Sequence, residues 1–193
     1  MLKKTDPPMT DQQLIERTVN GQAEAFEQLV QRYQGQLFNG ILRMVSSHAD
    51  AEDIVQEALV QAYLKLPLFR QDSAFYTWLY RIAVNNVYTH SRRQQRRVFP
   101  SRARPVSEEE LPDPRGTPDD ELERREQAGQ IEKAMAALGE EHRIILVLRG
   151  VEGFDYATIG RILDLSPGTV RSRLHRARLQ LRGHLLRTFY CCT

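Results

Sequence analysis

The sequence predicts an all-α protein made of two small helical domains joined by a flexible linker. Apolar residues recur at helical spacing in both halves of the chain, and no stretch alternates apolar and polar residues as a half-buried strand does. The pattern breaks in the segment FPSRARPVSEEELPDPRGTPDDELERRE, which holds five of the nine prolines and almost no large apolar residues. Prolines disfavour helix and like charges repel, so we expect an extended linker at 98–125 between domains at 10–97 and 126–193.

The net charge of +2 conceals blocks of opposite sign. Residues 70–104 carry eight basic side chains and one acidic, residues 105–141 carry four and twelve, and residues 142–193 carry nine and three. Two separated basic blocks predict two anion-binding surfaces. No apolar run approaches the roughly 20 residues of a membrane helix, and MLKKTDPPMT lacks the apolar segment of a secretory signal. We therefore expect a cytoplasmic protein that does not insert into a membrane.

Few residues suit metal binding or catalysis. Cys191 and Cys192 are adjacent, which favours reduced thiols over a disulfide framework. The five histidines form no metal-binding spacing, and the carboxylates Asp53 and Glu57, one helical turn apart, have no further acidic cluster or P-loop beside them. We expect no metal, no cofactor and no enzymatic activity.

Helical signals begin near the N-terminus. The stretch DQQLIERTVNG follows Thr10, a favourable N-cap residue, and stops at Gly21, as a capped helix does. A second helix is predicted after it, because Phe26, Leu29 and Tyr33 share one helical face.

The next helix, DAEDIVQEALVQAYLKLP, has two faces of different character. One face is apolar: Ile54, Val55, Ala58, Leu59, Ala62 and Leu66. The other mixes carboxylates with large apolar residues: Asp53, Glu57, Val60 and Leu64. A solvated face seldom carries such a mixture. Two interpretations remain, a helix buried on both sides and a docking face for a protein partner, and we favour docking.

The segment LFRQDSAFYTWLYRIAVNNVYTHSRRQQRR holds six of the fifteen aromatic residues and opens the first basic block. Aromatic rings interleaved with Arg and Asn suit single-stranded nucleic acid, since exposed bases stack on rings while Arg holds the backbone. Some of these rings also have core spacing. We expect Phe75 and Trp78 in the core, and the following side chains to be exposed: Tyr76, Tyr80, Asn85 and Asn86.

The C-terminal domain contains the pattern of a helix-turn-helix. A short helix with Ile159 and Ile162 is followed by a brief turn and a new helix that starts with Ser166 as N-cap and Pro167 at its first position. Two helices are predicted before it: one in ELERREQAGQIEKAMAAL with Ile131, Ala134, Met135 and Leu138 on one side, and a short, strongly apolar one in EEHRIILVLRGVEG.

The last helix sorts its residues by face. Its buried stripe is expected to consist of Val170, Leu174, Ala177 and Leu181. Ser172, His175 and Arg176 then point outward beside Arg171, while Arg173 and Arg178 flank them where they would meet phosphates of a major groove. Phosphate coating and a merely solvated face are the alternatives. A cap, a turn and a sorted helix together favour base reading.

Three segments carry a resemblance to a known family: DAEDIVQEALVQAY, FRQDSAFYTWLYRIAVN and SPGTVRSRLHRAR. Their order and content resemble bacterial extracytoplasmic-function sigma factors, near the sigma-E-like members. The resemblance implies a subunit that binds core RNA polymerase and directs it to promoters of stress or envelope-response genes. It also implies that the two helical domains correspond to sigma regions 2 and 4.

The resemblance assigns roles to particular residues. Those matching the helix that docks on the polymerase clamp are Asp53, Gln56, Glu57 and Val60. Those implied for capture of a flipped base and the melted −10 strand are Arg70, Gln71, Asp72, Ser73, Tyr76, Tyr80, Asn85, Arg92 and Arg93. Those implied for the −35 element are Thr169, Arg171, Ser172, Arg173, His175, Arg176 and Arg178. The expected partners are the clamp and flap of core RNA polymerase, promoter DNA and an anti-sigma factor, which can be membrane-anchored.

A one-component helix-turn-helix regulator is the principal alternative. It would need an effector pocket or a dimer face, and neither the linker nor the N-terminal domain offers an obvious one. An enzyme that processes DNA or RNA would need a catalytic constellation, which the sequence lacks.

Overall fold

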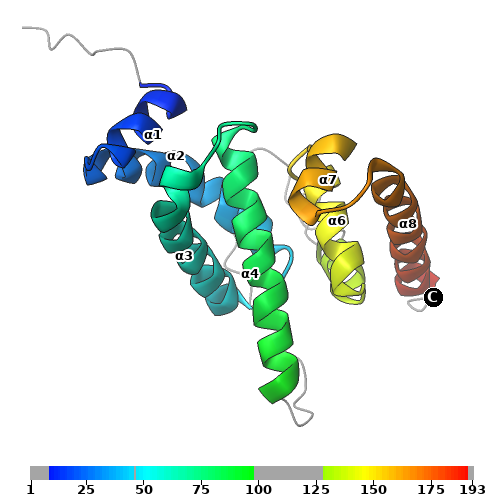
Figure 1. Cartoon of the computed structure of the whole chain (residues 1–193). Coiled ribbons are helices and arrows are strands. Elements are labelled where there is room, and N and C mark those ends of the chain that lie inside the picture. Colours follow the sequence, from blue (N-terminus) through cyan, green and yellow to red (C-terminus); the bar gives the residue numbers. More distant parts are fainter. Residues whose placement is uncertain (1–8, 46, 98–127, 191–193) are drawn as a thin grey trace, which may run out of the picture.

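The computed structural model describes residues 9–45, 47–97 and 128–190 (Figure 1). The N-terminal unit contains α1 (Asp11–Val19), α2 (Ala23–Leu42), α3 (His48–Lys65), the short 3-10 helix η1 (Leu66–Leu68) and α4 (Phe75–Arg97). The C-terminal unit comprises helical residues 128–136, α6 (Glu140–Gly150), α7 (Tyr156–Leu163) and α8 (Pro167–Tyr190). These ranges contain no strand, and the predicted all-α class is confirmed. The predicted linker and the two cysteines lie outside the described residues.

Side-chain caps start two of the helices where the sequence predicts them. At α1, Thr10 Oγ1 accepts a hydrogen bond from the Gln13 backbone N–H at 3.3 Å, and Gln13 Oε1 accepts one from the Thr10 N–H at 2.9 Å. At α8, Ser166 Oγ accepts from the Thr169 N–H at 3.2 Å. Each such cap stabilises its helix by about 0.5–2 kcal/mol.

The core of the N-terminal unit forms where α4 packs against α2 and α3. Among its residues without exposed surface are Leu14, Leu29, Leu37, Ile41, Leu79, Ala83 and Val84. Burying one Leu or Ile side chain contributes about 1.5–3 kcal/mol. Phe75 lies in the core as expected, at 3% exposed, whereas Trp78 is half-buried and packs against the core from outside, with its ring centroid 5.9 Å from that of Phe75 and 4.9 Å from that of Phe69.

The C-terminal unit is built around α6. Four of its side chains have no exposed surface: Ile144, Ile145, Val147 and Leu148. Against it pack α7 and α8, joined by a turn in which Asp164 adopts a left-handed backbone with φ 55°. A Cβ on Gly160 would lie 2.7 Å from the backbone oxygen of Leu165, so the turn requires glycine there. The predicted helix-turn-helix is therefore formed.

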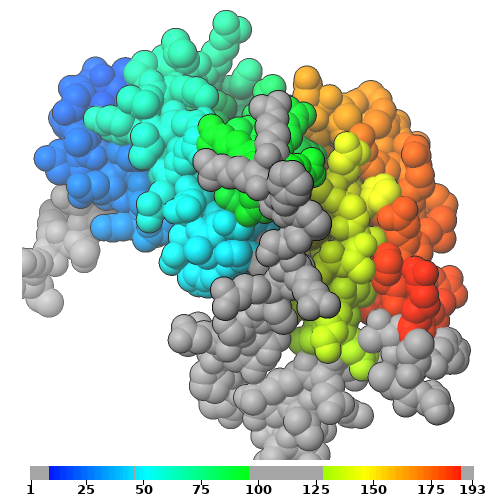
Figure 2. Space-filling view, turned by 90° about the horizontal axis from the view of Figure 1, so that it is seen from below, coloured from blue at the N-terminus to red at the C-terminus, as the bar shows by residue number. Residues whose placement is uncertain are grey.

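The two units pack against each other, chiefly through α4 and α7, and their buried residues belong to one continuous core. In the space-filling view they adjoin, blue to green and yellow to red (Figure 2). Arg143 of α6 adds a hydrogen bond from Nη1 to the backbone oxygen of Met44 at 3.3 Å. The sequence predicted the two units but not this interface between them.

None of the helices in the described ranges is both long and apolar enough to span a membrane.

Candidate nucleic-acid interface

The faces of α8 lie as its periodicity predicts. Val170, Leu174 and Ala177 are at most 1% exposed, and Leu181 is half-buried. The side chains expected to face DNA are exposed: Arg171, Ser172, His175, Arg176 and Arg178. This arrangement presents a polar, mostly cationic ridge at the beginning of a capped helix, which is the shape a recognition helix needs in a major groove.

Two other residues predicted to contact the −35 element interact with neighbouring side chains of the protein itself. Thr169 is half-buried, and its Oγ1 lies 2.8 Å from Ser166 Oγ. Arg173, whose side chain is only 23% exposed, forms an ion pair with Glu141 of α6 at 3.3 Å. Arg173 must therefore release the Glu141 carboxylate before it can bind a phosphate.

The second face of α3 is open to solvent. Asp53, Gln56 and Glu57 are exposed, and Val60 and Leu64 are 60% and 70% exposed. The alternative of a helix buried on both sides is therefore wrong. A groove of about 310 Å³ adjoins this face between α2 and α3, lined by Gln34, Gly35, Phe38, Glu52, Val55, Gln56 and Leu59. Exposed apolar side chains next to carboxylates are typical of a protein-docking surface.

The loop between η1 and α4 carries four of the candidate residues for the −10 element. Arg70, Gln71 and Asp72 are exposed and Ser73 is half-buried. Gln71 has a left-handed backbone with φ 57°, a conformation that costs a non-glycine residue about 1–2 kcal/mol. Local strain of this kind concentrates at binding sites. Periodicity offers no signal for it.

Along α4, Asn85, Arg92 and Arg93 are exposed as expected. The expected exposure of Tyr80 and Asn86 is wrong, since they are 0% and 7% exposed. The reason is that α4 packs against α3 on one side and α7 on another. Asn86 Oδ1 there accepts a hydrogen bond from Gln61 Nε2 of α3 at 3.1 Å.

Tyr76 is half-buried rather than exposed, and a residue of the C-terminal unit holds it. Its hydroxyl donates to Glu152 Oε2 at 2.8 Å. The ring of Phe154 lies 6.1 Å from that of Tyr76 and 5.5 Å from that of Tyr80. Burial and the nearby Glu152 carboxylate raise the pKa of both tyrosines, so both stay neutral over the physiological range.

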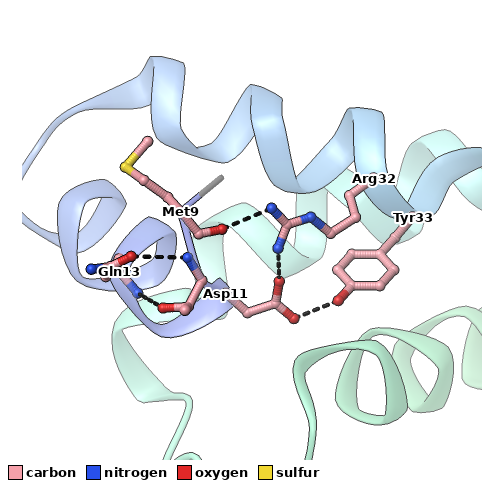
Figure 3. A network of polar contacts seen from close by, with 6 residues as sticks. Met9, Asp11, Gln13, Arg32 and Tyr33 are labelled. Carbon is pink, nitrogen blue, oxygen red and sulfur yellow. Dashed lines mark hydrogen bonds and ion pairs between the residues drawn. The ribbon is translucent and has the colours of Figure 1, made fainter. Parts of the chain in front are cut away.

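A polar network that the sequence did not predict joins Asp11, Arg32 and Tyr33 (Figure 3). The Asp11 carboxylate accepts hydrogen bonds from Arg32 and from the Tyr33 hydroxyl, and Arg32 also donates to the backbone oxygen of Met9 at 2.9 Å. Burial and the hydrogen bond to Asp11 raise the pKa of Tyr33 to about 12. The Tyr33 ring stacks on Tyr76, with centroids 5.3 Å apart and planes 23° apart. The network therefore fixes one side of the Tyr76 ring.

The described residues contain no group of three or more His, Cys, Asp or Glu placed to hold a metal ion.

Residues 29–97 match the model of sigma-70 region 2, and residues 128–181 match that of sigma-70 region 4. The chain is 40% identical over 180 residues to the ECF RNA polymerase sigma-E factor of Escherichia coli, covering 88% of this chain and 91% of that protein. It is 38% identical over 173 residues to the RNA polymerase sigma-H factor of Pseudomonas aeruginosa, covering 87% and 90%.

A solved structure is similar in fold as well. It is the sigma factor RpoE in complex with the anti-sigma factor NepR from Bartonella quintana, with a TM-score of 0.66 and 28% identity, covering 83% of this chain and 96% of that one. Each matched region lies within one of the two helical units, and the similarity to the curated relatives spans most of the sequence. The chain belongs to the sigma-70 family of RNA polymerase sigma factors, in its extracytoplasmic-function group.

Proposed function

We propose that this sigma factor reads the −35 element with the exposed face of α8, holds the opened −10 strand at the start of α4 and docks on core polymerase through α3. The observation that carries the proposal is the sorting of α8, with an apolar stripe buried against α6 and α7 and Arg171, Ser172, His175 and Arg176 exposed at its capped beginning. A solvated helix needs no such sorting.

At the −35 element, Arg171 and Arg176 are the residues suited to reading guanine. A guanidinium can donate two parallel hydrogen bonds to O6 and N7, worth about 1–3 kcal/mol of discrimination. Arg178 and, after leaving Glu141, Arg173 can neutralise phosphates on the groove walls.

At the −10 element, the loop around Gln71 is suited to capturing a flipped base, because it combines exposed polar side chains with a left-handed backbone at Gln71. Asn85 lies exposed along α4, and Arg92 and Arg93 add positive charge toward the end of that helix. A single strand that leaves the loop can therefore follow α4.

For polymerase docking, Asp53, Gln56 and Glu57 supply polar contacts and Val60 supplies apolar area on one exposed face. The expected partners in the polymerase are the clamp for this face and the flap for the C-terminal unit. An anti-sigma factor is a further expected partner, as in the similar complex of RpoE with NepR. The sigma factor acts in the cytoplasm as an initiation factor without catalytic chemistry or cofactor of its own, in a stress or envelope response.

Run-off transcription from a genomic fragment library with reconstituted holoenzyme tests this proposal. Discrete transcripts whose start sites share upstream motifs at the −10 and −35 positions are the expected result. Failure of the protein to co-elute with core polymerase, or transcription without any shared motif, would overturn it.

A further inference from the structure

The turn between α6 and α7, residues 151–155, reaches from the C-terminal unit onto the N-terminal unit. Glu152 Oε2 accepts hydrogen bonds from Tyr76 Oη at 2.8 Å and from Gln36 Nε2 at 3.1 Å. Phe154 packs its ring against Tyr76 and Tyr80. These contacts join the turn to both α2 and α4.

The residues beneath the turn belong to the set that the family resemblance implies for the melted −10 strand. Tyr80 is completely covered and Tyr76 is half-buried. Close by, Arg161 of α7 approaches the backbone oxygen of Asp72 at 3.5 Å, in the loop proposed to capture a flipped base. A strand that stacks on Tyr76 and Tyr80 needs the space that Phe154 occupies.

The surface that receives the turn is shaped for it. On α2, a Cβ at Gly40 would collide with the Tyr80 hydroxyl and would lie 2.7 Å from Glu152 Oε1, so glycine at 40 permits the close approach. On the far side of Tyr76, Tyr33 is stacked in place and anchored to Asp11. The Tyr76 side chain is therefore held on two sides, because its ring stacks on Tyr33 and its hydroxyl donates a hydrogen bond to Glu152.

The same arrangement leaves the recognition helix free. Arg171, Ser172, His175 and Arg176 stay exposed while the turn is seated. Closure thus separates the two DNA-binding surfaces, with the duplex-reading surface accessible and the stacking surface covered.

The packing of the turn against the N-terminal unit also includes one unfavourable feature, a buried hydroxyl. The Tyr80 hydroxyl lies between Gly40 of α2 and the turn, without a hydrogen-bond partner in the described part of the structure, and an unpaired buried hydroxyl lowers the stability of the packed arrangement. Aromatic packing and the bonds to Glu152 oppose this cost. A state balanced in this way can be opened by a ligand that binds the open form.

We propose that the turn with Glu152 and Phe154 is an intramolecular latch that competes with single-stranded DNA for Tyr76 and Tyr80. The free sigma factor is thereby kept from opened DNA until the two units separate, as on polymerase. The inference rests on the proposed function of α4, because a latch over these tyrosines matters only if they meet the opened strand.

The test uses the full chain without polymerase. Small-angle X-ray scattering reports separation of the units, and fluorescence anisotropy reports binding of a random-sequence pool of short DNA, offered as single strands and as duplex. The principal variant combines Glu152→Gln with Phe154→Ala. Tyr76→Phe is the milder variant, because it removes only the hydroxyl that donates to Glu152 and keeps the ring. Val151→Ala, at an exposed position of the same turn, is the matched control.

The double variant is expected to expand and to bind single strands about tenfold more tightly, because apparent affinity falls with the fraction of molecules in the competent state. Tyr76→Phe should shift both readouts in the same direction. Duplex binding should stay unchanged, and the control should match the wild type. Circular dichroism verifies that the variants retain their helices.

Two results would overturn the latch, and they differ in what else they affect. If both variants fold and stay as compact as the wild type, the turn does not hold the units together, and the proposed role of α4 is untouched. If they expand without any gain in single-strand binding, Tyr76 and Tyr80 do not receive the strand, and that part of the proposed function fails with the latch.

Discussion

The Tyr80 hydroxyl lies directly against Gly40 of α2, so close that the Cβ of any other residue at position 40 would collide with it. The hydroxyl is buried and has no hydrogen-bond partner among the described residues. From this contact we predict that one substitution increases the stability of the fold and another decreases it.

Tyr80→Phe should stabilise the protein by about 1 kcal/mol, because it removes a buried hydroxyl that has lost its water and gained no partner. Gly40→Ala should destabilise it, because the added methyl group collides with the Tyr80 hydroxyl and the Glu152 carboxylate and pushes both away from α2. Urea denaturation of both variants beside the wild type checks the signs. A loss of stability in Tyr80→Phe would mean that the hydroxyl is satisfied in solution.

The exposed face of α3 predicts a specific effect on assembly. Replacing Asp53 and Glu57 with Arg should abolish holoenzyme formation while leaving the helix content intact, because both side chains are exposed and lie outside the core. Gel filtration with core polymerase measures assembly. The control replaces Glu24 and Glu27, exposed on α2, with Arg and makes the same change of charge. Normal assembly by the Asp53/Glu57 variant would exclude this face as the docking surface.

Asn85 offers a test of the opened strand that leaves the core undisturbed, because it is exposed whereas Tyr80 is buried. Asn85→Ala should impair transcription more on a closed promoter than on a template already mismatched over the −10 region. The physical reason is that a contact with the separated strand helps to open the duplex. Run-off assays on the two templates decide, and equal losses on both would indicate a role unrelated to opening.

The raised pKa of Tyr33 predicts a loss of stability in alkali. Its folded value of about 12 exceeds the ordinary value of 10.0, so its contribution is complete below pH 10 and disappears as the pH rises toward 12. Tyr33→Phe should lower stability at neutral pH, because Asp11 loses a donor, yet should show a shallower decline above pH 10. Urea midpoints measured across this range test it. Parallel profiles for the two proteins would contradict the assignment.

The helical spacing of apolar residues was sufficient to predict the helices and the buried and exposed faces of α3 and α8. Each of these helices packs on one side, so buried and exposed residues alternate with the helical repeat. The burial of Val170, Leu174 and Ala177 and the exposure of Val60 and Leu64 both follow from it.

The same reasoning failed on α4 because that helix packs on more than one side. Tyr80 and Asn86 are polar enough to suggest solvent, yet Phe154 packs against the first and Gln61 donates a hydrogen bond to the Oδ1 of the second. The contact with Phe154 depends on how the C-terminal unit docks, and no local pattern encodes that docking. The left-handed backbone of Gln71 was hidden for a similar reason, since loop sequence without glycine gives no sign of it.

We expect α8 to read bases rather than only to coat phosphate. Arg176 lies on its exposed face near the capped end, whereas Arg182 is exposed farther along, where the helix should be leaving the groove. Arg176→Ala should relax preference at one or two adjacent −35 positions, by about 1–3 kcal/mol of discrimination. Arg182→Ala should weaken binding to all sequences alike and lower the salt dependence by about one phosphate contact.

The deciding measurement is binding of the full-length protein in reconstituted holoenzyme to a panel of single-base −35 variants at two salt concentrations. We expect Arg176→Ala to remove the base preference at one or two −35 positions and to leave the preferences at the others intact, while Arg182→Ala should preserve all of them. If Arg176→Ala lowers affinity for every sequence equally and leaves all base preferences unchanged, α8 only coats phosphate with positive charge and does not read bases.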